Sequence, residues 1–120
     1  MSDETNRNPD WDAVTRFRGI PEVDCRWTAN HAESMRLVDV REPDEFTGPL
    51  GHIEDAELIP LRQLVEAVTD WDRSAPVILV CRSGGRSGRA AVAMEQMGFE
   101  RVVSMAGGMI DWNECGLPVA

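Results

Sequence analysis

The chain has 120 residues, 42% of them hydrophobic, and a formal net charge of −9. This length supports one hydrophobic core and excludes two full domains with an active site between them. The negative charge repels phosphate backbones and anionic lipid surfaces, so we expect neither nucleic acid nor a membrane among the partners.

The N-terminal region differs from the rest of the chain. Its first ten residues are polar and predict a loosely attached arm that lacks the basic and apolar regions of a signal peptide. No apolar run approaches the roughly 18 residues of a membrane helix, so we expect a cytoplasmic protein. Large apolar side chains three residues apart predict a short helix over 11–17 that ends at Gly19. We expect this arm and helix to occupy 1–19 and the main domain 20–120.

A strong strand is predicted early in the main domain. Before it, weak alternation over 22–27 predicts an edge strand, and Thr28 is expected to cap a helix over 28–35. The run 36–41 is apolar except for charged residues that include Asp39, and a buried acid is costly unless it is paired. We expect Asp39 to accept hydrogen bonds from the loop that follows Cys81, or to pair with an arginine there. The alternative is that it caps its own following turn.

The segment after this strand is rich in turn-forming residues. Arg41 is expected to hold the adjoining loop, although a weak, solvated ion pair is the alternative. A helical turn is predicted at 43–46 and a breaker-rich loop at 47–51. We expect His52 to fix this loop rather than to act as a general base, because a thiolate stabilised by backbone dipoles does not need a base.

The central feature of the sequence is a strand, a short loop and a helix. Residues 77–80 form a β-prone apolar run that ends at Cys81, and an alanine-rich helical segment follows a loop of Gly, Ser and Arg. In α/β folds, ligands bind at the carboxyl ends of parallel strands. Backbone N–H groups of such a loop can point inward and stabilise negative charge. The expected centre of that charge is the sulfur of Cys81.

The surroundings of Cys81 are basic although the protein is acidic. Three arginines lie within eight residues of it, and no acidic residue occurs from 73 to 94. Such an environment lowers a thiol pKa from about 8.5 to roughly 3.5–7.5. We therefore predict that Cys81 is a nucleophilic thiolate; the alternative is a buried, inert cysteine at the end of a strand.

The other two cysteines show no metal-binding pattern. Cys25 and Cys115 are widely spaced, and the chain has only two histidines, so we expect no zinc site. An odd number of cysteines fits a reducing compartment. Cys25 and Cys115 are expected to be core or surface thiols, although either could reach Cys81 and resolve an oxidised or persulfidated form of it.

Strands and helices alternate along the main domain. The remaining expected elements are a strand over 56–59, a helix over 61–68, a strand over 101–105 and a closing helix that runs through Trp112. This alternation predicts an α/β fold with a mainly parallel sheet and helices on both faces.

The length of the loop after Cys81 limits what it can hold. Four residues separate Cys81 from Arg86, whereas cysteine-dependent phosphatases have five between the thiolate and their phosphate-binding arginine. The shorter loop encloses a smaller anion-binding space, which fits one sulfur bonded to the cysteine better than a phosphate.

Three parts of the chain resemble the single-domain rhodanese family, the thiosulfate sulfurtransferases. The sequence Cys-Arg-Ser-Gly-Gly-Arg-Ser at 81–87 is similar to the family's active-site loop. The upstream and downstream signatures of the family resemble residues 37–46, 51–53, 56–60 and 107–112. In the family's order, these parts span about residues 36–119.

The resemblance implies a three-layer α/β/α fold around a mainly parallel sheet of about five strands. It also implies a sulfurtransferase that moves a sulfane sulfur from thiosulfate or a similar anionic donor to cyanide or a thiol, with a protein thiol as a further possible acceptor. The sulfur would be carried as a Cys81 persulfide, and no metal or other cofactor is expected.

Each residue of the loop has an expected role. The N–H groups from 82 to 87 would hold the persulfide charge, and Arg82 and Arg86 would orient the anionic donor. Ser83 and Ser87 would donate hydrogen bonds or cap the helix. The expected substrate-binding set is Arg82, Ser83, Gly84, Gly85, Arg86 and Ser87, with Asp39 and Arg41 in support.

The sequence leaves two other functions open. The chain could be a rhodanese-like protein-binding or redox-sensing module with little turnover. It could also be an arsenate reductase or phosphatase of related fold, which the short loop after Cys81 disfavours.

Overall fold

The computed structural model describes residues 10–120. Apart from Asp10, the polar arm expected at the N-terminus lies outside the described residues. Within 10–120, no helix has the length and apolar character needed to cross a membrane.

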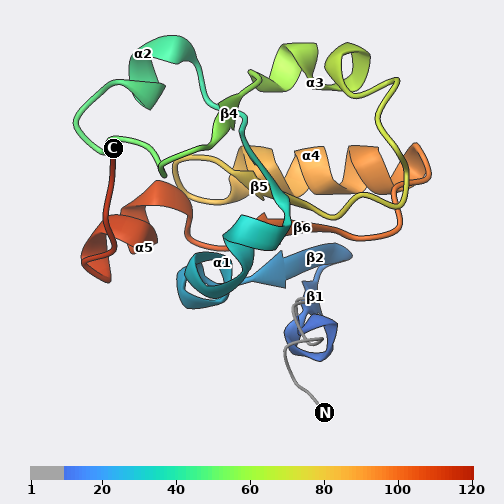
Figure 1. The fold of residues 1–120 in the computed structure, drawn as a ribbon, viewed down its shortest axis with the longest axis horizontal. Coiled ribbons are helices and arrows are strands. Elements are labelled where there is room, and N and C mark those ends of the chain that lie inside the picture. Colours follow the sequence, from blue (N-terminus) through green and yellow to red (C-terminus); the bar gives the residue numbers. More distant parts are fainter. Residues whose placement is uncertain (1–9) are drawn as a thin grey trace.

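A single six-stranded sheet forms the centre of the molecule (Figure 1). Its strands are β1 (Thr15–Phe17), β2 (Ile20–Val23), β3 (Arg36–Asp39), β4 (Glu57–Leu58), β5 (Val77–Val80) and β6 (Val102–Met105). Their order across the sheet is β1-β2-β6-β5-β3-β4. Four neighbouring pairs are parallel: β2 with β6, β6 with β5, β5 with β3, and β3 with β4. The remaining pair, β1 with β2, is antiparallel. The predicted α/β fold with a mainly parallel sheet is confirmed, with β1 as an additional antiparallel strand.

Helices cover both faces of the sheet. The α-helices of residues 10–120 are α1 (Cys25–His31), α2 (Pro43–Phe46), α3 (Leu61–Ala67), α4 (Gly85–Gln96) and α5 (Gly108–Glu114), of which all but α2 contribute to the buried clusters. Within the described residues 10–120, two short 3-10 helices are also present, η2 (Trp11–Ala13) and η3 (Ala32–Ser34). One buried cluster packs the sheet against α3 and α4, and a second packs it against α1 and α5. The two clusters are the two interfaces of a three-layer sandwich (Figure 1).

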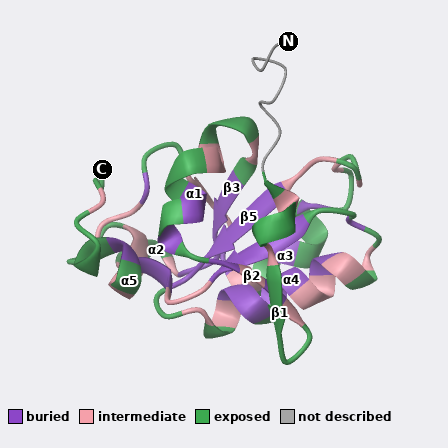
Figure 2. Cartoon of the chain, turned by 90° about the horizontal axis from the view of Figure 1, so that it is seen from below, coloured by how far each residue is buried: buried purple, intermediate pink, exposed green. Residues whose placement is uncertain are grey.

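The position of β5 inside the sheet explains why its sequence is an unbroken apolar run. All four of its residues are buried (Figure 2), because helices lie on both sides of it. Val77, Leu79 and Cys81 belong to the cluster on the α3 and α4 side, whereas Ile78 and Val80 belong to the cluster on the α1 and α5 side. This alternation directs the Cys81 side chain toward the face that α4 covers.

The helix expected over 11–17 is wrong. Only 11–13 is helical, as a single 3-10 turn, and Thr15–Phe17 forms the first strand of a hairpin with β2. The two residues of the hairpin loop, Arg18 and Gly19, have φ of 54° and 83°. Positive φ at both positions is what a tight two-residue hairpin turn requires. An Arg-Gly pair is a weaker signal for this turn than Asn-Gly, so the helical spacing dominated the prediction.

The edge strand over 22–27 and the Thr28 cap are also wrong. Strand β2 ends at Val23 and has neighbours on both sides, and α1 begins at Cys25. The true N-cap is Asp24, whose carboxylate accepts a hydrogen bond from the Trp27 amide at 2.8 Å. A carboxylate at this position satisfies a free amide of the first turn, and Thr28 is buried within the helix.

Candidate active site

The turn between β5 and α4 places Cys81 beside the start of a helix. Gly84 is the N-cap of α4 and has φ of 110°, a conformation that side chains other than glycine's rarely adopt. This turn folds residues 82–84 back over the sulfur. The same geometry brings a backbone amide to the thiol, because the Gly84 N–H donates to Cys81 Sγ at 3.0 Å.

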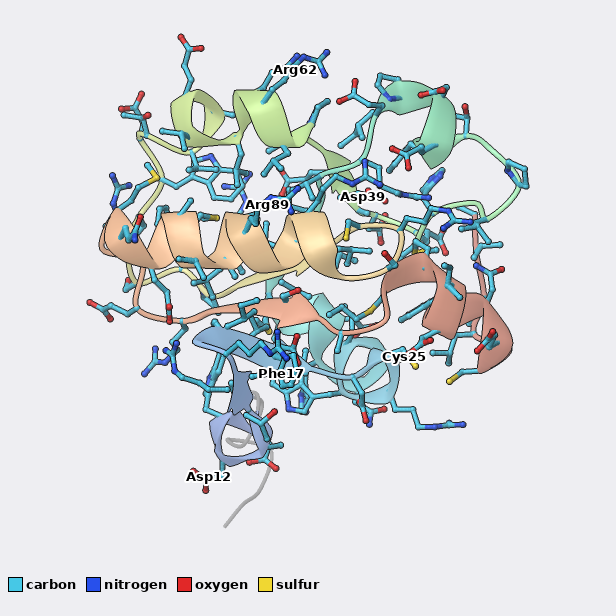
Figure 3. All side chains as sticks on the ribbon, turned by 180° about the vertical axis from the view of Figure 1, so that it is seen from behind. Asp12, Phe17, Cys25, Asp39, Arg62 and Arg89 are labelled. Carbon is cyan, nitrogen blue, oxygen red and sulfur yellow. The ribbon has the colours of Figure 1, made fainter. Side chains whose placement is uncertain are left out.

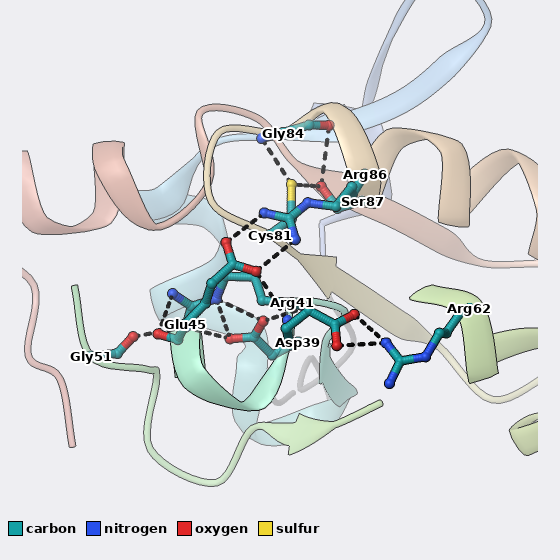
Figure 4. A network of polar contacts seen from close by, with 10 residues as sticks. Asp39, Arg41, Glu45, Gly51, Arg62, Cys81, Gly84, Arg86 and Ser87 are labelled. Atoms are coloured by element: carbon teal, nitrogen blue, oxygen red, sulfur yellow. Dashed lines mark hydrogen bonds and ion pairs between the residues drawn. The ribbon is translucent and has the colours of Figure 1, made fainter. Parts of the chain in front are cut away.

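The Cys81 thiol is buried and held by hydrogen bonds. The residue is 1% exposed, and its Sγ lies 3.4 Å from Ser87 Oγ in the first turn of α4 (Figure 4). Burial raises the pKa of Cys81, but hydrogen bonds from the Ser87 hydroxyl and from the loop amides outweigh it and leave the pKa below its ordinary value. The thiolate is therefore stabilised by dipoles that point at it.

A second serine, which the sequence analysis missed, supports Ser87. Ser104 on β6 is fully buried, and its Oγ lies 2.7 Å from Ser87 Oγ. When Cys81 is ionised, Ser87 can turn its only hydroxyl proton toward the sulfur while Ser104 donates to Ser87. The available signal was the polar Ser104 within the apolar run of a predicted buried strand, where a hydroxyl needs a partner.

Helix α5 supports the loop from outside. The Met109 N–H donates to the carbonyl of Cys81 at 2.9 Å, and the Ile110 N–H donates to the carbonyl of Arg82 at 3.0 Å. Gly108 makes this close approach possible, because a Cβ there would lie 2.5 Å from the Cys81 carbonyl oxygen. The first amides of α5 thus satisfy carbonyls of the Cys81 loop.

Arg86 is held by an acid from a distant part of the chain. Its guanidinium makes two hydrogen bonds to Glu45 of α2, from Nη1 to Oε1 at 2.7 Å and from Nη2 to Oε2 at 2.8 Å (Figure 4). The hydrogen bonds from Arg86 lower the pKa of Glu45 to about 2 despite partial burial. Arg86, which was expected to orient the donor, therefore ties the start of α4 to α2.

Asp39 and Arg41 form an ion pair in which each side chain is 1% exposed. Arg41 Nη2 lies 2.8 Å from Asp39 Oδ2, and the Arg41 backbone amide donates to Oδ1 at 3.1 Å. The expectation that the Cys81 loop or its arginines bind Asp39 is wrong, because all of its side-chain bonds in the described structure come from Arg41. The second interpretation, an Asp that caps its own turn, matches the amide contact.

Arg41 also contacts the loop that follows α2, as expected. Its guanidinium donates to the carbonyls of Glu45 at 3.2 Å and Gly51 at 2.7 Å (Figure 4). His52 contacts the same region, with Nδ1 3.0 Å from the Phe46 carbonyl and its ring stacked on the Phe46 ring. These contacts hold the end of α2 and the loop after it, residues 45–52, in place across from the Cys81 loop.

A pocket of about 240 Å³ lies between the loop after α2 and the Cys81 loop. It is lined by Arg41, Glu45, Pro49, Leu50 and Arg82. The Arg82 side chain is exposed and makes no ion pair with any residue from 10 to 120. The pocket adjoins the Cys81 loop, because Arg82 follows the cysteine directly and Glu45 binds Arg86.

The remaining residues of the predicted set occupy different positions. Ser83 is exposed, and Gly85 is the first residue of α4. Cys25 and Cys115 do not approach Cys81: Cys25 lies in the cluster on the opposite face of the sheet, and Cys115 lies beside Cys25.

Comparisons with known proteins found similar sequences and structures. The sequence model of the family described as "Rhodanese-like domain" matches residues 24–115. The chain is 32% identical over 98 residues to "Thiosulfate sulfurtransferase GlpE" of Vibrio cholerae, a match that covers 82% of this chain and 91% of that protein. It is 37% identical over 86 residues to an uncharacterized Synechocystis protein; this match covers 72% of the chain but about half, 47%, of that longer relative.

A solved structure shares the fold. The crystal structure of a rhodanese-related protein from Thermoplasma volcanium superposes with a TM-score of 0.75 at 28% sequence identity. The match covers 82% of this chain and 96% of that one.

Proposed function

This chain belongs to the rhodanese-like domain family, and on that premise we propose that it is a sulfurtransferase that carries a sulfane sulfur on Cys81. The observation that carries the proposal is the environment of Sγ, with the Gly84 amide at 3.0 Å and the Ser87 hydroxyl at 3.4 Å. These donors stabilise a thiolate, and in this proposal the amides of the Cys81 loop also hold the charge of the persulfide.

The first half-reaction loads the cysteine. The Cys81 thiolate attacks the sulfane sulfur of thiosulfate; a bond forms between the two sulfurs while the bond from the sulfane sulfur to the sulfonate breaks. The electron pair leaves with sulfite, and the negative charge of the thiolate moves to the outer sulfur of the persulfide. Charge is conserved, and no cofactor takes part.

Arg82 orients the donor in this proposal. Its exposed guanidinium lines the pocket beside the Cys81 loop, whereas the Arg86 guanidinium is paired with Glu45. A guanidinium can bind two oxygens of a sulfonate. Arg86 then acts as a positioning residue, because its pair with Glu45 holds α2 and α4 together beside this pocket.

The second half-reaction unloads the cysteine. Cyanide or a thiolate attacks the outer sulfur of the persulfide, the bond between the two sulfurs breaks, and the electron pair returns to Cys81 as thiolate. The apolar Pro49 and Leu50 that line the pocket favour an acceptor with a carbon skeleton beside its thiol, either a small thiol or a cysteine of another protein.

Mass spectrometry tests the proposal directly. The full chain is treated with thiosulfate, and the expected product is heavier than the protein by the mass of one sulfur atom. The added sulfur should map to Cys81, should disappear on addition of cyanide with formation of thiocyanate, and should be absent in Cys81→Ser. An unmodified wild-type protein with no thiocyanate would contradict the proposal.

A further inference from the structure

The remaining two cysteines form a close pair on the other side of the sheet from Cys81. Cys25, the first residue of α1, and Cys115, the C-cap of α5, have their Sγ atoms 3.0 Å apart. Figure 3 shows Cys25 at the start of α1, next to α5. We infer that Cys25 and Cys115 are a dithiol that is converted reversibly to a disulfide by a low-molecular-weight thiol disulfide.

The geometry needs little change for this bond. A disulfide has its sulfurs about 2.05 Å apart, so the two atoms need to approach by about 1 Å. Cys25 is 5% exposed and Cys115 is exposed. An external disulfide can therefore reach Cys115 directly, whereas Cys25 can be reached only through Cys115.

The accessibilities set the order of the two exchange steps. Cys115 as thiolate attacks one sulfur of the small disulfide, a mixed disulfide forms on Cys115, and the first small thiolate leaves. Cys25 then loses its proton and attacks the Cys115 sulfur, the mixed disulfide breaks, and the second small thiolate leaves. The protein loses two protons and two electrons, and the small disulfide takes them up to become two thiols.

Burial, together with charge, explains why Cys25 acts second. Burial, the hydrogen bond with Cys115 and the negative charges of Cys115, Asp24 and Asp111 raise the pKa of Cys25 to about 11. Once Cys115 is in a mixed disulfide, its own charge is gone, and Cys25 gives up its proton more easily.

The disulfide would join the C-terminal end of α5 to α1, whereas the N-terminal end of α5 contacts the Cys81 loop. The first amides of α5 hold the carbonyls of Cys81 and Arg82, and Cys115 terminates the same helix. The two cysteines are 90 positions apart, so the cross-link would restrict the unfolded chain strongly. Oxidation would therefore stabilise the helix that supports the active site without touching Cys81.

Peptide mapping tests the dithiol. Reduced full-length protein is incubated with oxidised glutathione and digested with trypsin without reductant. We expect a disulfide-linked pair of peptides, residues 19–26 joined to 102–120, with Cys81 in the separate peptide 74–82. The linked pair should also form in Cys81→Ser, which separates this result from the fate of the proposed sulfur transfer. A wild-type protein that keeps glutathione on Cys115 and forms no linked pair overturns the inference.

Single variants test the order of the steps. Cys25→Ser should accumulate one glutathione on Cys115, and Cys25→Ala gives a second variant if serine is not tolerated in the buried position. Cys115→Ser should leave Cys25 unmodified; glutathione on Cys25 in that variant would contradict the order.

Thermal unfolding tests the link between α1 and α5. In the Cys81→Ser background, the oxidised protein should unfold several degrees above the reduced protein, and addition of Cys115→Ser should remove the difference. Equal unfolding temperatures of the oxidised and reduced forms would contradict the stabilising role.

Discussion

Glu45 and Arg86 join α2 to the first turn of α4 through two parallel hydrogen bonds of 2.7 and 2.8 Å. The two residues are 41 positions apart, and each side chain is about 30% exposed. This ion pair joins α2 to α4 beside the Cys81 loop, and of the arginines in that loop Arg82 lines the pocket.

Replacement of Glu45 should destabilise the protein in a pH-dependent way. Because Arg86 lowers the folded-state pKa of Glu45 from 4.5 to about 2, its contribution is present above pH 4.5 and is lost as the pH falls toward 2. Glu45→Gln should cost about 1 kcal/mol at pH 7, a value discounted for partial exposure. Urea unfolding from pH 7 to pH 3 should show this difference shrinking. Glu57→Gln, in a more exposed pair with Arg36, is the matched control and should change stability less.

The Ser87 hydroxyl should control the ionisation of Cys81. Its hydrogen bond lowers the pKa of Cys81, so Ser87→Ala should raise that pKa and slow the reaction with iodoacetamide severalfold at mildly acidic pH. Ser104→Ala should act in the same direction but more weakly, because Ser104 contacts the sulfur only through Ser87. The pH dependence of alkylation measures both effects. Ser83→Ala, with an exposed side chain, should match the wild type; a shift as large as that of Ser87→Ala would contradict the assignment.

Arg82 and Arg86 should differ in their effects on thiosulfate turnover. Arg82→Ala removes a cation from the pocket and should raise the KM for thiosulfate about tenfold, which corresponds to about 1.4 kcal/mol, with little effect on alkylation of Cys81 by a neutral reagent. Arg86→Ala leaves Glu45 without its partner and should lower thermal stability as well. Steady-state kinetics beside iodoacetamide rates separate the two roles. An unchanged KM in Arg82→Ala would assign donor binding to another residue.

Gly108→Ala should damage the active site from outside the Cys81 loop. The new Cβ would meet the carbonyls of Cys81 and Arg82, and backbone atoms cannot move aside as a flexible side chain can. We expect a loss of roughly 1–3 kcal/mol of stability and a large fall in sulfur transfer. Gly116 also has positive φ but no atom near its Cβ position. Gly116→Ala should therefore cost about 1 kcal/mol and retain activity.

The buried pair of Asp39 and Arg41 should be sensitive to loss of one charge. Asp39→Asn leaves the guanidinium without its counter-ion in a site that is 1% exposed, and such a change costs on the order of 3–5 kcal/mol. Denaturant unfolding measures the loss. The double variant Asp39→Leu with Arg41→Met should recover part of the stability, because no unpaired charge remains. A double variant less stable than Asp39→Asn would show that the contacts of Arg41 to the carbonyls of Glu45 and Gly51 matter more than the ion pair.

The sequence by itself determined those structural elements whose conformation is set by residues close together in the chain. The run before Cys81 is apolar at every position because the strand is buried on both faces, and the glycine and serine after it allow a tight turn into a helix. The family, the parallel sheet and the position of Cys81 at the end of the central strand all follow from such local patterns.

Only the tertiary structure decided which distant side chains meet. Glu45 reaches Arg86, Ser104 reaches Ser87, and Cys25 reaches Cys115 because strand order and helix packing bring them together. Spacing along a chain fixes which face of a strand or helix a side chain occupies, but not which element packs against that face. For the same reason the sequence placed three arginines near Cys81, and the folded chain was needed to show that Glu45 holds Arg86 and that Arg82 lines the pocket.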